Sequence, residues 1–405
     1  MTVRNFLKIF FIFLSIFSLV KLYDHAINLE TFQYGEWLIN YQYGFVRRGL
    51  IGEIIYLFSL LFNNNIQISF FLITSFFCLT YYFLNYNLIK NIKFNFAYYF
   101  IIFSPLFYIF FIVISKVGIR KEIILYIFFL LYLTHLNSQN FILKKNWKFI
   151  FIFPLLLLNH EGAFFYLPYL ILPILFIIDK KELKTFISQT IVLIFLSSLV
   201  LILLYFNKGS EAHTINICTS LGNYAPLKCE WWGPIAGLNK EILKNLNNES
   251  MSFFYLAASP KTWLGFLFYI FYGFIPILVL LSFTKIGCKS FDIKSKSFFL
   301  IYLVIMGFSL PLFHLAEDWS RWFSIHFHLL AFLIFFLQNK NLIIFKNNSN
   351  FSKIDNFLNN SKMKKIFIIL ILFYSTSFHH HHFFFKGVKL EFTYNKIFQK
   401  IKSSL

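Results

Sequence analysis

The chain has 405 residues, of which 58% are hydrophobic, 22% aromatic and only 13% charged. A soluble globular protein carries about a quarter charged residues, so this composition excludes most soluble classes. The net charge of +20 would indicate nucleic-acid binding on a soluble protein. Here the basic residues mostly lie between long apolar runs, where the positive-inside rule of membrane proteins places them. We therefore expect one polytopic membrane domain that binds the lipid bilayer and no nucleic acid.

Apolar runs close to the length that a helix needs to cross a membrane, about 20 residues, recur along the chain. We expect membrane helices at 6–22, 67–86, 97–114, 123–137, 147–158, 163–178, 186–206, 262–284, 297–313 and 322–337, with a shorter eleventh run at 366–378. The stretch 50–62 is apolar but short, and we expect it to lie in the outer interface. The predicted fold is an all-α polytopic membrane protein with about 10–11 transmembrane helices.

The basic residues also predict an orientation. They concentrate in the loops 87–96, 138–146, 179–185, 285–296 and 338–365. The positive-inside rule puts these loops and the N-terminus in the cytoplasm. The predicted segments are a membrane module over 1–180 with outer loops 23–66 and 115–122, a span at 181–206, an extracytoplasmic loop at 207–261, membrane helices over 262–378 and a basic tail at 379–405.

The cysteines and the sequence motifs give little information about function. Cys218 and Cys229 share the loop 207–261 and either form a disulfide, if that loop is extracytoplasmic, or stay as two thiols. Nucleotide-binding and metalloprotease motifs do not occur. The four histidines at 379–382 are internal and precede three Phe. We expect neither a metal nor a cofactor.

Ionisable residues within or beside membrane spans are costly, so each is a candidate functional residue. The first group is Glu36, Arg47 and Arg48, with glycines at 44 and 49 beside the two arginines. Adjacent arginines on the outer side run against the sorting rule, and the planar guanidinium matches phosphate oxygens. The alternative is an interfacial turn whose arginines extend toward the water.

A second basic loop contains Lys116, Arg120 and Lys121. On the outer side it would be a second anion-binding feature, with the neighbouring Glu122 as a candidate base. It would be an ordinary cytoplasmic loop if 50–62 crossed the membrane.

His160 and Glu161 follow a run too short to cross alone. A His beside a carboxylate at partial depth suits proton transfer. Adjacent residues on a regular helix point about 100° apart, so a local break is needed for both to act together. The alternative is that neighbouring helices satisfy each side chain separately.

Two further groups complete the candidates. Asp318 and Arg321 are three residues apart and can pair on one helical turn. In the long loop, exposed Trp231 and Trp232 would stack on sugar rings. The alternatives are an interfacial aromatic belt and a lid that packs on the helix bundle.

The order of spans and loops resembles the GT-C group of integral-membrane glycosyltransferases. The shared features are a span, a long outer loop with acids and an interfacial helix, then two spans and a second outer loop, over about residues 1–180. Within that group, a Phe-, Ile-, Lys- and Asn-rich chain with outer arginines is similar to the O-antigen and capsule repeat-unit polymerases (Wzy type). The resemblance is one of topology and rests on no sequence signature.

This resemblance implies transfer between polyprenyl-diphosphate-linked oligosaccharides at the outer face of the bacterial inner membrane, with a chain-length regulator as a further partner. Arginines would hold the diphosphate, and by position Arg47, Arg48, Arg120 and Arg321 match that use. The catalytic acid of the first outer loop corresponds to Asp24 or Glu36. That loop has no Asp-x-Asp pair, which argues against a metal-dependent version.

Two other classes compete with this interpretation. A flippase for lipid-linked oligosaccharides should have cations midway along the bundle and two similar halves, and no internal repeat is visible. An O-acyltransferase would use a membrane His in a different context. A purely structural scaffold would not explain the acids, His and Arg predicted on the outer side.

Overall fold

The computed structural model describes residues 3–92, 94–108, 119–138, 142–239, 264, 267, 270–287, 295–315, 319–346 and 349–376. These residues are mostly helical, and their one sheet has two short strands, which confirms the predicted all-α class. The chain forms two compact units. The N-terminal unit contains 5–88 and 119–246, and the C-terminal unit contains 1–4, 89–118 and 247–405.

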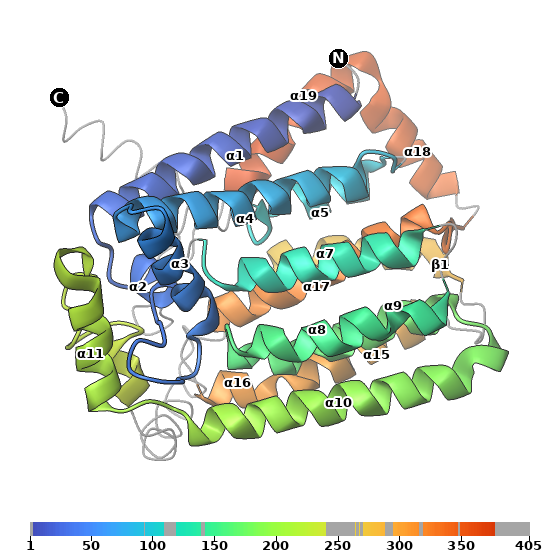
Figure 1. The fold of residues 1–405 in the computed structure, drawn as a ribbon. Helices are drawn as coiled ribbons and strands as arrows, with labels where there is room; N and C mark the ends of the chain where they lie inside the picture. The colour runs from blue at the N-terminus through green and yellow to red at the C-terminus, as the bar shows by residue number, and fades with distance from the viewer. Residues whose placement is uncertain are drawn as a thin grey trace, which may run out of the picture. The chain divides into compact units, whose positions relative to one another are not determined.

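The N-terminal unit is built from helices that run side by side. Its elements are α1 (Val3–Ile27), α2 (Gln33–Trp37), α3 (Leu50–Leu61), α4 (Ile66–Ile89), α7 (Glu122–Asn137), α8 (Trp147–Leu157), α9 (Pro168–Ile177), α10 (Leu183–Phe206) and α11 (Glu211–Leu221), with short 3₁₀ turns at Leu143–Asn146, Glu161–Tyr166, Lys180–Glu182, Gly222–Tyr224 and Ala236–Asn239. In Figure 1, α2, α3 and α11 gather at one end of the long helices.

Helix length separates the elements of this unit into two kinds. Among the described residues, four helices are long and apolar enough to cross a membrane, and three of them, α1, α4 and α10, belong here. Their outward faces carry exposed apolar side chains such as Ile9, Phe76 and Ile191, as expected of a surface in contact with lipid. The helices α7, α8 and α9 are shorter. The protein is therefore a membrane protein by the length and composition of its helices.

The helix α3 covers most of the apolar stretch 50–62, for which we predicted an interfacial position. It has 12 residues, which is too short to cross the hydrocarbon. Ile54, Leu57 and Leu61 form an exposed apolar stripe, spaced three and four residues apart. This geometry fits a helix that lies along the membrane surface.

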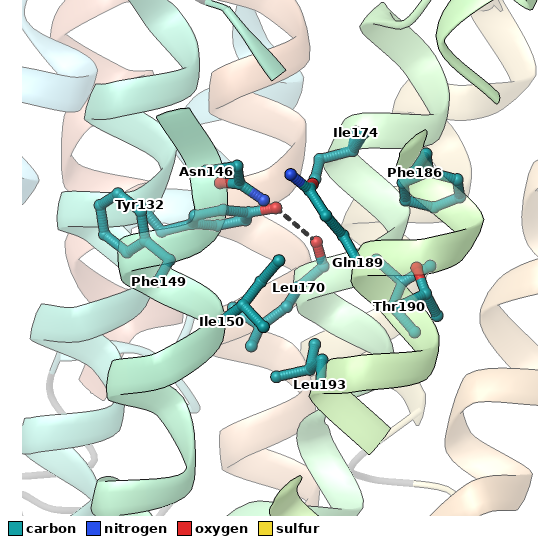
Figure 2. Close-up of a pocket in the computed structure, with 11 residues that line it drawn as sticks. Tyr132, Asn146, Phe149, Ile150, Leu170, Ile174, Phe186, Gln189, Thr190 and Leu193 are labelled. Carbon is teal, nitrogen blue, oxygen red and sulfur yellow. Dashed lines mark hydrogen bonds between the residues drawn. The ribbon is translucent and has the colours of Figure 1, made fainter. Parts of the chain in front are cut away.

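Two hydroxyl contacts in the N-terminal unit join neighbouring helices. The hydroxyls of Ser18 and Tyr82 are 2.8 Å apart and join α1 to α4. The Tyr132 hydroxyl donates to the Leu170 carbonyl at 2.6 Å beside a cavity of about 20 Å³ (Figure 2). This cavity is large enough for a single water molecule. Its lining comes from α7, α8, α9 and α10 and the turn before α8, with the polar residues Tyr132, Asn146, Gln189 and Thr190. Its small size makes it a packing feature between these helices and not a substrate site.

The C-terminal unit contains α5 (Phe96–Ile102), a π-helical turn (Ile270–Phe274), α14 (Ile275–Phe283), α15 (Ser295–Phe308), α16 (Leu310–Leu315), α17 (Trp319–Asn339), α18 (Ser349–Asn359) and α19 (Ser361–Thr376). The strands β1 (Thr284–Ile286) and β2 (Ile343–Phe345) pair antiparallel. The helix α17 is the fourth candidate span, and its side chains are largely buried in the unit.

One predicted helix is shorter than expected. The run 97–114 was predicted as a single span, but α5 ends at Ile102 and residues 103–107 form turns. Pro105 explains the end, because proline has no N–H to donate and disfavours helical geometry in the residue before it. Asn95 caps the other end by accepting the N–H groups of Ala97 and Tyr98.

Candidate functional site

A buried ion pair lies at one end of the N-terminal unit. The Arg120 Nε donates to Glu36 Oε2 at 2.5 Å, and the two side chains are 6% and 0% exposed. The Nε2 atom of His160 is 4.0 Å from Glu36 Oε1 and 3.9 Å from Glu122 Oε1. Residues from three separate loops therefore meet at one place.

The short helix α2 holds Glu36 in this position. All five residues of α2 are buried, and the indole of Trp37 donates to the Ile119 carbonyl at 3.2 Å. Gly35 leaves room for Pro226, whose Cγ would lie 3.2 Å from a Cβ at that position. Neighbours on two sides thus fix the orientation of the Glu36 carboxylate.

A second ion-pair group joins the adjacent arginines to Glu161. The Arg48 Nε donates to both carboxylate oxygens, at 3.0 and 2.8 Å, and its Nη2 donates to Oε1 at 2.5 Å. The Arg47 Nη1 is 3.2 Å from the same Oε1. These side chains are 13% (Arg47), 24% (Arg48) and 22% (Glu161) exposed, so this group is less deeply buried than the pair of Arg120 and Glu36.

Arg47 also connects the first loop to the loop after α10. Its guanidinium donates to the carbonyls of Lys208 and Gly237, and its backbone N–H donates to the Asn207 carbonyl. These carbonyl acceptors were missed by sequence reasoning, because a backbone carbonyl leaves no signature in the sequence. Arg47 is thus largely committed to structure, whereas every side-chain hydrogen bond shown for Arg48 goes to Glu161.

The backbone of Arg48 adopts an unusual conformation. Its φ is +66°, in the left-handed region that a non-glycine residue seldom occupies. The Lys121 Nζ donates to the Arg48 carbonyl at 2.5 Å, and the fork to Glu161 holds the side chain. A strained residue that is fixed from both ends is a frequent feature of functional sites.

The ionisation of this cluster follows from burial and charge. Burial lowers the pKa of Lys121 to about 7. Burial, together with the charge of Arg48, lowers the pKa of His160 to about 4, so His160 is neutral at pH 7. Burial alone would raise the pKa of Glu161, but Arg48 and Arg47 outweigh it and hold this pKa well below its usual range.

His160 and Glu161 face different partners. The helix α8 ends at Leu157, and His160 is extended with φ −161° and ψ 110°. This is the local break that the sequence required, but it points His160 toward Glu36 and Glu161 toward the arginines. The His160 Nδ1 accepts the N–H of Gly162 at 3.0 Å. Neutral His160 therefore carries its proton on Nε2, and the nearest carboxylate oxygens lie 4.0 and 3.9 Å from that atom.

The loop after α10 packs on the same end of the unit. Cys218 and Cys229 form a disulfide, which decides between the two states left open by the sequence. Trp231 is 86% exposed and Trp232 55% exposed. The Trp232 ring packs edge-on against Phe32, with ring centroids 5.8 Å apart. The two indoles are thus held on a cross-linked loop beside α2.

The remaining predicted residues are not among the described members of the cluster. Lys116, Asp318 and the histidines 379–382 fall outside the described residues. Arg321 belongs to the C-terminal unit, where it is 4% exposed and its guanidinium lies 5.1 Å from the Trp322 ring centroid. Asp24 accepts the side-chain amide of Asn28 at 2.8 Å. The structure does not place these residues in the cluster.

The cluster contains four cationic side chains, three carboxylates and one neutral His: Arg47, Arg48, Arg120, Lys121, Glu36, Glu122, Glu161 and His160. Within the described part of the chain, no group of three or more His, Cys, Asp or Glu residues is arranged to hold a metal ion. Comparisons with protein-family models, curated proteins and solved structures find no match to this chain.

Proposed function

We propose that the protein is a multi-pass glycosyltransferase of the bacterial inner membrane that polymerises polyprenyl-diphosphate-linked oligosaccharide repeat units. The supporting observation is the convergence of Arg47 and Arg48 with the basic loop at 120–121. The cations exceed the carboxylates in this cluster, so it favours an anionic ligand. A diphosphate on a lipid carrier meets the requirements for both charge and membrane access.

The geometry of Arg48 suits a phosphate group. The guanidinium of Arg48 presents two donors side by side, as its bidentate contact with Glu161 shows. Phosphate oxygens have the same spacing as carboxylate oxygens for such a fork. The lysine at 121, whose amine supports the Arg48 backbone, adds positive charge near the same place.

The disulfide supports an extracytoplasmic site. Disulfides persist in oxidising compartments outside the bacterial cytoplasm. The loop that carries Cys218 and Cys229 is tied to Arg47 through the carbonyls of Lys208 and Gly237. The disulfide and the charged cluster therefore belong to the same side of the membrane. This is the side on which lipid-linked repeat units are joined in enzymes of the proposed class.

The proposed reaction is a displacement at the anomeric carbon of the donor sugar. The acceptor hydroxyl oxygen forms the new bond to that carbon, and the bond from the carbon to the diphosphate breaks with its electron pair leaving on the diphosphate. The arginines stabilise the developing negative charge. The hydroxyl proton passes to a carboxylate of the cluster. Trp231 and Trp232 would stack on sugar rings of the lipid-linked acceptor.

The position of the charges favours transfer over flipping. In the N-terminal unit the ionisable cluster lies where α2, the start of α7 and the end of α8 meet. A flippase for an anionic lipid needs cations along its path through the bundle. The charges of this cluster are confined to one level instead of following a path, which suits a fixed site for a reaction.

Deleting the gene and separating the surface glycolipids on a gel tests the proposal. We expect a core that carries a single repeat unit, with the ladder of longer chains lost. Complementation with Arg48→Ala should fail, and Arg48→Lys should restore little, since an ammonium cannot form the fork. Arg4→Ala is the matched control, because Arg4 is exposed. An unchanged ladder in the deletion strain, or full complementation by Arg48→Ala, would refute the proposal.

A further inference from the structure

The arginine fork of the cluster is already occupied. The Glu161 carboxylate receives three hydrogen bonds from Arg48 and one from Arg47. An anion that uses the same donors cannot bind while these bonds exist. Because all three side chains are partly exposed, the contact can open without unfolding the helices around it.

We propose that Glu161 occupies the place of the donor diphosphate in the free protein and that, once displaced by it, Glu161 is the base that takes the proton from the acceptor hydroxyl. The identity of the anion rests on the proposed function; the competition between Glu161 and an anion at Arg48 rests on the ion-pair geometry alone.

The exchange is physically reasonable because the two anions differ in charge but share their geometry. A carboxylate carries one negative charge and offers two oxygens to the fork. A diphosphate carries more charge and offers more oxygens, so it can satisfy Arg48 and Arg47 together.

The displaced carboxylate gains basicity only when the donor is present. While the arginines hold it, the pKa of Glu161 is well below its usual range, because their charge outweighs the effect of burial. Transfer of the guanidinium contacts to the diphosphate removes this stabilisation and places a negative charge nearby, and both changes favour proton uptake. The proton then moves from the acceptor oxygen to Glu161 as that oxygen bonds to the anomeric carbon, and the diphosphate departs on the arginines.

This arrangement also accounts for the charge balance of the free site. Two adjacent arginines without a counter-ion would repel one another in a partly buried position. Glu161 neutralises one of their two charges until the donor arrives. The donor therefore binds before Glu161 becomes an active base. In the empty site Glu161 is held by the arginines, so it cannot activate water.

The test measures binding of inorganic diphosphate to the purified full-length protein in lipid nanodiscs by isothermal titration calorimetry. We expect Glu161→Gln to bind roughly tenfold more tightly than the natural protein, a factor equivalent to about 1.4 kcal/mol. The matched control is Glu53→Gln, because Glu53 accepts hydrogen bonds from Tyr41 and Gln42 within the same loop. This control should leave diphosphate affinity unchanged.

Two further variants keep the result interpretable. Glu161→Asp retains the charge on a shorter side chain and should tighten binding less than Glu161→Gln; it replaces the Gln variant if that variant does not fold. In an Arg48→Gln background, Glu161→Gln should tighten diphosphate binding much less than in the natural background, because only the Arg47 donor is then shared. Equal or weaker diphosphate binding by Glu161→Gln in the natural background would overturn the inference.

A kinetic measurement separates the role of Glu161 as the base from its role as a competitor of the diphosphate. In a transfer assay with polyprenyl-diphosphate-linked units, Glu161→Gln should lower KM for the donor and lower kcat by roughly 100-fold or more. An unchanged kcat would overturn the assignment of Glu161 as the base. If diphosphate binding tightens as expected but no lipid-linked donor supports transfer, then the proposed function fails while the competition at Arg48 stands.

Discussion

Replacing Glu36 by Gln should destabilise the protein more than replacing Arg120 by Met, although the two residues form one ion pair. The reason is the charge of the surrounding cluster. Near pH 6, His160 is neutral and Lys121 is protonated, because their pKa values are about 4 and about 7. The cluster then has one more cation than carboxylate. Loss of Glu36 raises the excess to two, whereas loss of Arg120 brings the cluster to neutrality.

The size of each effect follows from burial. Removing one partner of a buried ion pair costs about 3–5 kcal/mol, because the other charge stays buried without compensation. Glu36 is 0% exposed and Arg120 6% exposed, so solvent cannot replace the lost partner. We expect about 5 kcal/mol for Glu36→Gln and about 3 kcal/mol or less for Arg120→Met. The double variant should be more stable than Glu36→Gln alone.

The assay is equilibrium unfolding in mixed micelles with an increasing fraction of SDS near pH 6, followed by tryptophan fluorescence. The four states of the double-mutant cycle give the coupling energy between the two side chains, which we expect to be at least about 2 kcal/mol. If Arg120→Met lowers the free energy of unfolding as much as Glu36→Gln does, the charge count is contradicted. Additive effects within about 0.5 kcal/mol would show that the ion pair does not couple the two loops.

Three further predictions concern other parts of the N-terminal unit. The folded pKa of His160, about 4, lies below its ordinary 6.5; stability should therefore fall as the pH drops from about 6.5 to about 4, and His160→Asn should flatten this part of a stability–pH curve. Reducing Cys218–Cys229, which are 11 residues apart, should lower the free energy of unfolding by roughly 2–3 kcal/mol, and a membrane-impermeant maleimide should label these thiols in intact spheroplasts only after reduction; labelling confined to lysed cells would reverse the proposed orientation. Gly52→Ala should cost about 3 kcal/mol in thermal unfolding, since the added Cβ would overlap the Ile39 carbonyl oxygen, and a change below about 0.5 kcal/mol would exclude this close contact.

The helices were largely predictable because apolar composition and length determine them in a membrane protein. The predicted spans at 67–86, 123–137 and 186–206 correspond to α4, α7 and α10 within a few residues. The error at 97–114 has a local cause. The mean hydropathy of this run is high even though it contains Pro105. The helix nevertheless ends before Pro105, because proline has no N–H to donate and restricts the residue before it.

The residues of the cluster were predictable individually, but their pairing was not. Charge in an apolar context marked Glu36, Arg47 and Arg120 as unusual. Which carboxylate meets which cation depends on loop conformations that no periodicity encodes. The left-handed backbone of Arg48 and the break before Glu161 are two such conformations. Adjacent His and Glu suggested a joint role in proton transfer, and the break instead turned them toward different partners.

The short helix α8 determines how deep the reaction would take place. Its 11 residues rise about 16 Å, roughly half of a hydrocarbon layer that is about 30 Å thick. The neighbouring α10 has 24 residues and rises about 36 Å. In the proposed orientation, Glu161 therefore lies below the level of the lipid headgroups, and the carrier must bring its diphosphate down to that depth to reach it. The reaction then depends on bilayer thickness, because the depth from the headgroups to Glu161 is smaller in a thinner membrane and larger in a thicker one.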